Sequence, residues 1–149
     1  MKARSDLDVR ALVDGSYAFK ALSPAERAAL ATAARAVSYA DGEIIIREDD
    51  EGLELLLVAD GRVRVSTIAA DGDLGLAELG AGAIVGEVAV LTGTRRTSTV
   101  TAAGEVAAIS FPADAVRAAA EANPGFRKIL QRLVEGRALH TISVIPPTP

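Results

Sequence analysis

Short β-type runs separated by turn residues fill the middle of this chain, and this punctuation restricts its fold more than any other feature. Residues typical of turns occur at Asp60-Gly61 and in the stretch 70–73. Between them, polar and apolar residues alternate over 62–66, so Val63 and Val65 are predicted to face the core. Such short, evenly spaced strands predict a small antiparallel barrel, roll or sandwich. The predicted strands are 43–46, 53–58, 62–66, 74–79, 97–101 and 105–111.

Helical patterns precede this region. Residues 7–40 are rich in alanine and are predicted to be helical. A helix start is clear within them, because Ser23 is a typical N-cap, Pro24 suits the first helical position and Glu26 completes a capping box.

After Pro112 the pattern becomes helical again. One helix is predicted over 113–122 and a second from 125 to about 140, with a break at Asn123-Pro124 between them. The second helix carries an apolar face made by Phe126, Ile129, Leu130, Leu133 and Val134. We therefore predict one α+β domain over 1–149, divided into a helical part (7–40), a β-roll part (41–111), two helices (112–142) and a Pro-rich tail (143–149).

Composition narrows the class of protein. Half of the 149 residues are hydrophobic and 24% are charged, which is typical of a folded globular chain. The net charge of −4 argues against direct binding of nucleic acid, which needs a basic face. The N-terminus lacks the apolar core of a signal peptide and no apolar run reaches membrane-spanning length, so we expect a cytoplasmic protein without membrane contact.

One stretch, residues 80–103, has the composition of a phosphate site, and we call it the cassette. Gly86 followed by Glu87 and apolar residues predicts a tight turn that opens a one-turn helix over 87–91, whose free N–H groups suit a phosphate. Arg96 can form bidentate bonds with phosphate oxygens, while the carboxylate of Glu87 can accept from sugar hydroxyls. The adjacent Arg95 is interpreted as a solvated arginine. Together these groups predict a site for one phosphate joined to one ribose.

The motifs of the chain resemble a known family. In order, they are Phe19-x-x-Leu22, Gly42-Glu43-Ile44-Ile45 with Glu48-Asp49-Asp50 and Gly61, Leu79-x-x-Gly82-x-x-Val85-Gly86-Glu87, and Arg96-x-x-Thr99-Val100. From about Phe19 to Thr141 the chain resembles the cyclic nucleotide-binding domain shared by the catabolite activator protein, protein kinase regulatory subunits and gated ion channels. That resemblance implies a jelly-roll-like antiparallel β-roll with N-terminal helices, a short cassette helix and two C-terminal lid helices.

The resemblance also implies roles for individual residues. Glu87 would hold the ribose 2′-hydroxyl and Arg96 would pair with the cyclic phosphate. Arg137 and Thr141 would reach the base from the closing helix. The remaining implied ligand contacts come from the turn, the short helix and the strand start: Val85, Gly86, Val88, Ala89, Thr97 and Ser98.

The implied ligand is cAMP or cGMP, with no metal. Thr97 is similar to the threonine that accompanies guanine tolerance in this family, whereas Thr141 favours adenine. Two residues depart from the family pattern: Asp49 stands where glycine is usual, which predicts a strained or altered turn, and Arg95 stands where many members have proline.

The functional hypothesis is a cyclic nucleotide sensor that acts by ligand-induced lid closure on an unknown downstream protein. One alternative is the sensor half of a Crp/Fnr-type transcription regulator, since no helix-turn-helix follows the closing helix. A second is a nucleotide-independent interaction module, with homodimerisation through the apolar face of the C-terminal helix. We do not expect an enzyme, because the chain has one histidine, no cysteine, no Gly-x-Ser-x-Gly motif and no metal-ligand spacing.

Overall fold

The computed structural model describes the backbone of residues 1–69 and 72–142, and their side chains except those of 68, 69, 73 and 134–142. The predicted tail, 143–149, lies outside the described residues. Helices and strands follow in the order β1 (Lys2–Ala3), α1 (Val9–Gly15), the 3₁₀ helix η1 (Tyr17–Phe19), α2 (Pro24–Ala33), β2 (Arg35–Tyr39), β3 (Ile44–Ile46), β4 (Glu54–Ala69), β5 (Gly72–Leu79), β6 (Ile84–Val85), α3 (Glu87–Thr92), β7 (Thr99–Pro112), α4 (Ala113–Ala122) and α5 (Pro124–Ile142).

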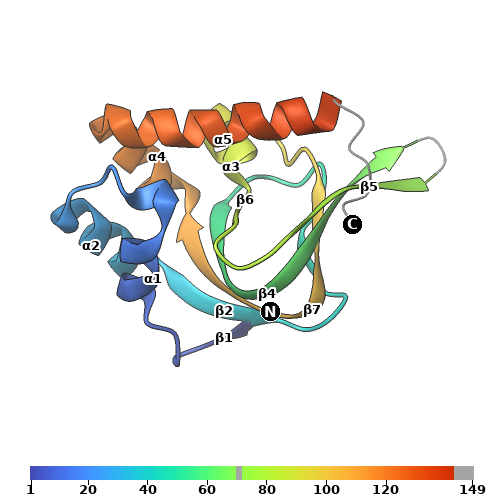
Figure 1. The fold of residues 1–149 in the computed structure, drawn as a ribbon, viewed down its shortest axis with the longest axis horizontal. Helices are drawn as coiled ribbons and strands as arrows, with labels where there is room; N and C mark the ends of the chain where they lie inside the picture. Colours follow the sequence, from blue (N-terminus) through green and yellow to red (C-terminus); the bar gives the residue numbers. More distant parts are fainter. Residues whose placement is uncertain (70–71, 143–149) are drawn as a thin grey trace.

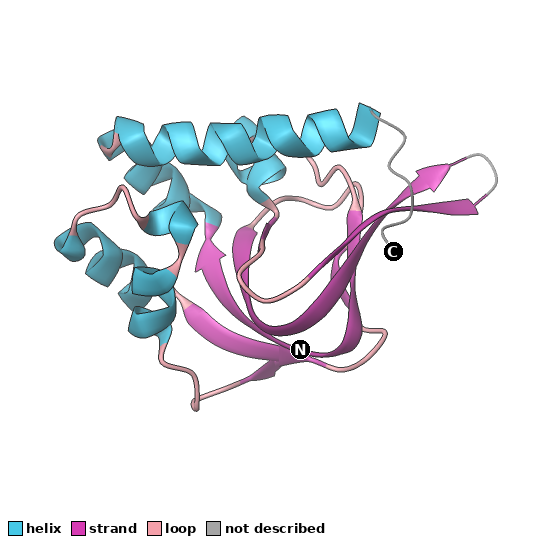
Figure 2. Ribbon diagram, viewed as in Figure 1, coloured by secondary structure: helices cyan, strands magenta, loops and turns pink. Residues whose placement is uncertain are grey.

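The predicted antiparallel β-roll is confirmed. Within the described residues, seven strands form one sheet in the order β1-β2-β7-β4-β5, while β3 pairs with β7 and β6 pairs with β4. All of these pairings are antiparallel. The long strands β4 and β7 curve together through the centre of the molecule (Figure 1 and Figure 2). The strand path does not return to its start, so the roll is open.

The N-terminal helical region is shorter than predicted. Helix α2 has the expected capping box between Ser23 and Glu26, but it ends at Ala33. Residues 35–39, predicted to be helical, form strand β2, in which Val37 pairs with Ala108 and Tyr39 with Val106 of β7. The helical prediction for this segment is wrong because pairing with a neighbouring strand outweighs the helical propensity of an alanine-rich sequence.

Asp60-Gly61 was the second wrong prediction, since it lies within strand β4 instead of forming a turn. The pairing register of β4 with β7 shifts between Val58 and Arg62, which marks a bulge. Gly61 has a φ of +92°, and a Cβ on it would lie 2.3 Å from the carbonyl oxygen of Glu105. Glycine here therefore lets two long, bent strands approach closely. The predicted strands 97–101 and 105–111 likewise merge into one strand, β7.

Two apolar cores lie on opposite sides of this sheet, since successive residues of β4 alternate between them. Leu56 and Val58 contribute to a cluster inside the roll, whereas Leu55 and Leu57 contribute to a cluster shared with the helices. The two predicted C-terminal helices are present as α4 and α5, and α5 lies across α4 and α3 (Figure 1).

The apolar face of α5 is occupied within the chain. Phe126, Ile129 and Leu130 are buried in or beside the helix-side core. Homodimerisation through the C-terminal helix stays a prediction, and these three buried side chains would contribute little to such an interface.

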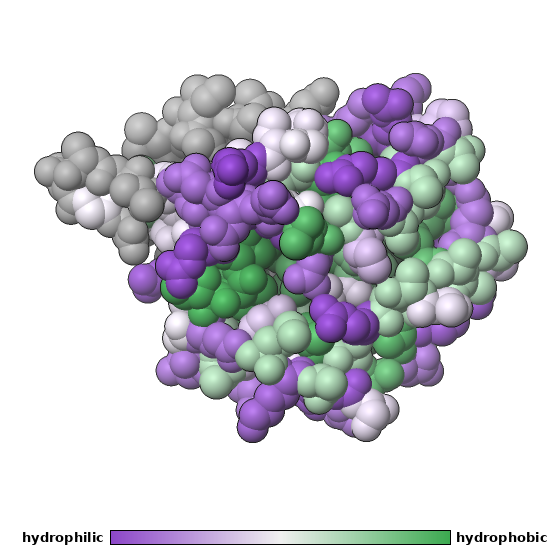
Figure 3. Space-filling view, turned by 180° about the vertical axis from the view of Figure 1, so that it is seen from behind, coloured by the Kyte–Doolittle hydropathy of each residue, from purple (hydrophilic) through white to green (hydrophobic). Residues whose placement is uncertain are grey.

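On the outer surface, apolar residues are interspersed with polar ones, as the rear face in Figure 3 shows. Large apolar side chains that stay exposed include Tyr17, Ile44, Leu53 and Leu74. Among the helices of residues 1–142 that the structure describes, none is long and apolar enough to cross a bilayer.

Candidate functional site

Arg96 forms the centre of the candidate site. Its side chain is only 6% exposed, although it carries a full charge. Nη1 donates a hydrogen bond to the carbonyl oxygen of Gly86 at 3.1 Å, and Nη2 donates to the carbonyl oxygen of Glu54 at 2.6 Å. The guanidinium group therefore joins the turn before α3 to the start of β4. Because it carries five N–H donors, further donors are available for an anion.

Gly86 is required by the position of Arg96. It is the N-cap of α3 with a φ of +89°, a left-handed conformation that other residues rarely adopt. A Cβ at this position would lie 2.5 Å from Nη1 of Arg96 and 3.0 Å from the carbonyl oxygen of Glu54. The predicted tight turn and one-turn helix are confirmed, with α3 ending at Thr92.

Carboxylates surround the buried guanidinium group. Glu87, the first residue of α3, is 2% exposed. Burial lowers the pKa of Arg96, and the negative charges of Glu54, Glu87 and Asp50 oppose this shift. Arginine titrates so far above neutral pH that Arg96 stays charged. The site therefore combines a buried cation with a buried acid at the end of a short helix.

The loop before β4 supports the backbone of Arg96. The N–H of Asp49 donates to the carbonyl oxygen of Arg96 at 2.9 Å, and the N–H of Arg96 donates to that of Asp50 at 2.8 Å. Nη1 of Arg95 donates to the carbonyl oxygen of Asp49 at 2.9 Å. Arg95 is exposed, as predicted, but it also braces this loop.

Asp49 has a φ of +71°, a left-handed conformation for a residue other than glycine. This position is the one at which the family pattern has glycine, so the predicted strain in the turn is confirmed.

Most of the predicted ligand residues lie together. Val85, Gly86, Glu87, Val88 and Ala89 are consecutive across β6 and the first half of α3, and Gly86 contacts Arg96. Thr97 and Ser98 follow Arg96 and lead into β7. Arg137 and Thr141 fall on α5, in the part whose side chains are not described, so their contact with a base stays a prediction.

Sequence reasoning missed two supports of the site. The carbonyl group of Glu54 anchors Arg96, but a backbone acceptor leaves no signature in residue type. Gly52 lies against α3, where an added Cβ would be 2.4 Å from that of Ala89. A glycine just before an apolar strand was the only available signal for this contact.

The N-terminal elements connect directly to the start of α5. The ring of Phe19 lies 5.1 Å from that of Phe111 and 5.7 Å from that of Phe126, measured between centroids. Nδ2 of Asn123 donates to the carbonyl oxygen of Ala21 and to Oε1 of Glu26, both at 3.0 Å. The joint between α4 and α5 is thus fastened to η1 and α2.

Residues 36–123 match the model of the cyclic nucleotide-binding domain, and this match covers more than half of the chain. The chain belongs to the cyclic nucleotide-binding domain family.

Relatives of this cyclic nucleotide-binding domain occur in proteins of different kinds. The acetyltransferase Pat of Mycolicibacterium smegmatis is 38% identical over 88 residues, which cover 59% of this chain and 26% of that protein. A CRP-like cAMP-activated global transcriptional regulator of Mycobacterium tuberculosis is 28% identical over 124 residues, covering 83% of this chain and 55% of the regulator.

A solved structure of a cAMP-binding acyltransferase from Mycobacterium smegmatis is also similar. It has a TM-score of 0.65 and 29% identity, and the match covers 84% of this chain and 40% of that one. The matched region thus accounts for about a quarter to just over half of each of these relatives.

Proposed function

We propose that this domain binds the phosphate of a cyclic nucleotide at Arg96 and responds by moving its C-terminal helix. The buried guanidinium group of Arg96, held by two carbonyl oxygens beside the start of α3, is the observation that carries this proposal. Gly86 contacts Arg96 directly, and in this proposal the backbone groups of Val88 and Ala89, which follow on α3, also face the ligand. In this arrangement Glu87 accepts from the ribose 2′-hydroxyl, and Thr97 and Ser98 flank the phosphate.

Adenine is the base we favour. Both the transcriptional regulator and the acyltransferase with which the chain shares the domain are named for cAMP. Thr97 keeps cGMP as the second candidate, through its resemblance to the threonine of guanine-tolerant members. The proposed base contacts are Arg137 and Thr141 of α5.

Movement of α5 would follow from its position. It packs on α3, which borders the proposed phosphate site, and on α4. Suppose that α5 can adopt two positions and that the ligand binds more tightly in one of them. The ligand then shifts the population toward that position, by an amount set by the difference in affinity. The stacked rings of Phe19 and Phe126 would transmit the shift to the N-terminal elements.

The output of such a shift is regulatory in our proposal, without catalysis by this domain. Relatives with the same domain include an acetyltransferase and a transcriptional regulator, so one sensor type accompanies different outputs. The sensor half of a transcription regulator and a nucleotide-independent module remain the alternatives. A cytoplasmic location and an unidentified downstream protein are further parts of the proposal.

Titration calorimetry with cAMP and with cGMP tests the proposal on the wild-type chain, on Arg96→Ala and on Arg95→Ala. Loss of a buried charge partner costs about 2–5 kcal/mol, so Arg96→Ala should bind at least about thirtyfold more weakly. Arg95→Ala is the matched control: it removes an adjacent, exposed arginine with one hydrogen bond to Asp49, so its loss of affinity should be far smaller than that of Arg96→Ala.

Arg96→Lys keeps a buried positive charge but loses the planar group that joins the carbonyl oxygens of Gly86 and Glu54. It therefore separates the effect of the charge from the effect of the guanidinium geometry. Absence of heat with either nucleotide on the folded wild type would refute the sensor function. Equal affinity of wild type and Arg96→Ala would show that the site is elsewhere.

A further inference from the structure

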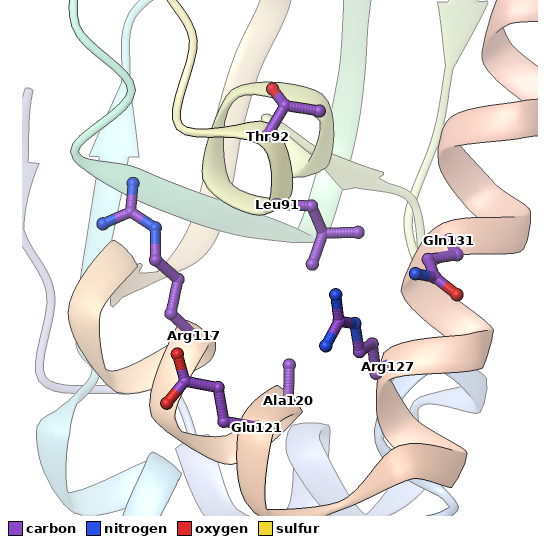
Figure 4. Close-up of a pocket in the computed structure, with 7 residues that line it drawn as sticks. All are labelled: Leu91, Thr92, Arg117, Ala120, Glu121, Arg127 and Gln131. Atoms are coloured by element: carbon purple, nitrogen blue, oxygen red, sulfur yellow. The ribbon is translucent and has the colours of Figure 1, made fainter.

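A pocket lies where α3, α4 and α5 meet (Figure 4). Its volume is about 410 Å³, which lies within the range of small-molecule sites. None of the residues that the cyclic nucleotide proposal uses lines it. The lining residues are Leu91 and Thr92 of α3, Arg117, Ala120 and Glu121 of α4, and Arg127 and Gln131 of α5.

Arg127 supplies a cation that faces the pocket. Its guanidinium group extends into the middle of the space in Figure 4. In the part of the chain that the structure describes, its side chain forms no hydrogen bond or ion pair. Gln131 lies one turn further along α5, and residues four apart share a helix face, so amide and guanidinium groups line the same wall.

Arg117 lines the opposite edge of the pocket, and its guanidinium group points away from that of Arg127 in Figure 4. Its Nε donates to the carbonyl oxygen of Val90 at 2.8 Å, near the end of α3. Its Nη1 lies 3.3 Å from Oδ1 of Asp114, whose side chain is almost fully exposed. These contacts hold Arg117 at the edge of the pocket, so Arg127 is the cation that faces a ligand.

Glu121 and the apolar floor define the rest of the ligand. A carboxylate in the same pocket repels a plain anion, but it accepts hydrogen bonds from an amino or hydroxyl group. Leu91 and Ala120 offer apolar contact between the polar walls. We propose that this pocket binds a small organic anion, with a phosphate or carboxylate group on Arg127 and a donor group on Glu121.

Binding here would also affect the proposed nucleotide site, and this step rests on the proposed function. Helix α3 contributes Leu91 and Thr92 to the pocket and begins at Glu87, beside Arg96. A ligand that holds the C-terminal end of α3 in one position changes the relative free energies of the positions that Glu87, at the other end of the helix, can adopt. The two affinities are then coupled reciprocally.

NMR titration of the ¹⁵N-labelled chain without nucleotide tests the pocket. The probes are O-phosphoserine and L-aspartate, which distinguish a phosphate from a carboxylate source, and glycerol as a neutral control. We expect saturable shifts confined to α3, α4 and α5 with at least one of the two anions and none with glycerol. Arg127→Gln should weaken this binding at least about tenfold, since it removes a charge-assisted hydrogen bond. Arg132→Gln, an exposed change outside the pocket on the same helix, should leave it intact.

Unsaturable or scattered shifts with both anions would overturn the site, as would wild-type affinity in Arg127→Gln. For the coupling, cyclic nucleotide affinity is measured with and without a saturating anion in both proteins. A change in the wild type that disappears in Arg127→Gln supports the coupling, and an unchanged affinity overturns it. Failure of any nucleotide to bind would reject the proposed function while the anion titration still decides the pocket.

Discussion

Gly86 and Arg96 fit together so closely that a side chain at position 86 would collide with the guanidinium group. Nη1 of Arg96 donates to the carbonyl oxygen of Gly86 at 3.1 Å, and the same nitrogen would lie 2.5 Å from any Cβ at that position. The chain thus places its buried cation by leaving out a side chain. This relationship is local in space, although ten residues separate the two partners.

Gly86→Ala should therefore damage both stability and ligand binding. The positive φ alone costs an alanine roughly 1–2 kcal/mol, and displacement of Arg96 adds to that. Gly82→Ala is the matched control, because Gly82 has a φ of +91° with open space around its missing Cβ. Urea unfolding should show a smaller loss for Gly82→Ala, and calorimetry should show weakened nucleotide binding only for Gly86→Ala. Equal losses of stability in the two variants would contradict the predicted clash between a Cβ at position 86 and the side chain of Arg96.

At Asp49 the opposite change is expected, because a glycine there should increase the stability of the folded chain. Relief of the left-handed conformation should raise the free energy of unfolding by up to about 1 kcal/mol in Asp49→Gly, and Asp49→Ala should lower it. Both variants keep the backbone hydrogen bond from the N–H of residue 49 to the carbonyl oxygen of Arg96. Asp50→Gly, without a positive φ to relieve, should destabilise. A stability order with alanine above glycine at position 49 would contradict the strain.

Local signals explain which parts of the fold were predicted from sequence. The capping box of Ser23 and Glu26 and the turn at Gly86 were predictable because residue type alone specifies them. Strand β2 was not, because Val37 and Tyr39 form a strand only through pairing with β7. Gly61 has the residue type of a turn, but its positive φ serves the close crossing at Glu105. At the site, the side chain of Arg96 was predictable, whereas the carbonyl oxygen of Glu54 that holds it was not.

Phe19 should be among the most sensitive positions for stability. Its side chain is fully buried between Phe111 and Phe126, so Phe19→Ala should lower the free energy of unfolding by about 3–5 kcal/mol. Tyr17→Ala changes the same 3₁₀ helix at a residue that is 61% exposed, and should cost far less. Chemical unfolding of both variants gives the comparison. Similar losses would mean that the contacts among these three rings contribute little to the stability of this joint.

Glu26 should make stability depend on acid pH. Its pKa is lowered from the ordinary value of 4.5 by hydrogen bonds from the backbone of Ser23 and the side chain of Asn123. A lowered pKa in the folded state means that this stabilisation is complete above about pH 4.5 and is lost as the pH falls through the folded value. The stability difference between wild type and Glu26→Ala should therefore shrink below that pH. Glu26→Gln keeps an acceptor oxygen without titrating, so its difference from Glu26→Ala should persist in acid. If the stability difference between wild type and Glu26→Ala did not change with pH, the ionised carboxylate of Glu26 would not be the source of this stabilisation.

Asn123→Asp separates two roles of the residue between α4 and α5. Its Oδ1 accepts from the N–H of Phe126 at 3.1 Å, an N-cap bond that aspartate provides equally well. Its Nδ2 donates to Ala21 and Glu26, and an oxygen in that place loses both bonds and faces a carboxylate. Unfolding at pH 7 should show a loss of about 1–3 kcal/mol in Asn123→Asp. Asn123→Asp in a Glu26→Gln background restores a donor opposite the new carboxylate and should recover part of that loss. If the single and double variants are equally destabilised, the contact between Asn123 and Glu26 does not fasten α5 to the N-terminal helices.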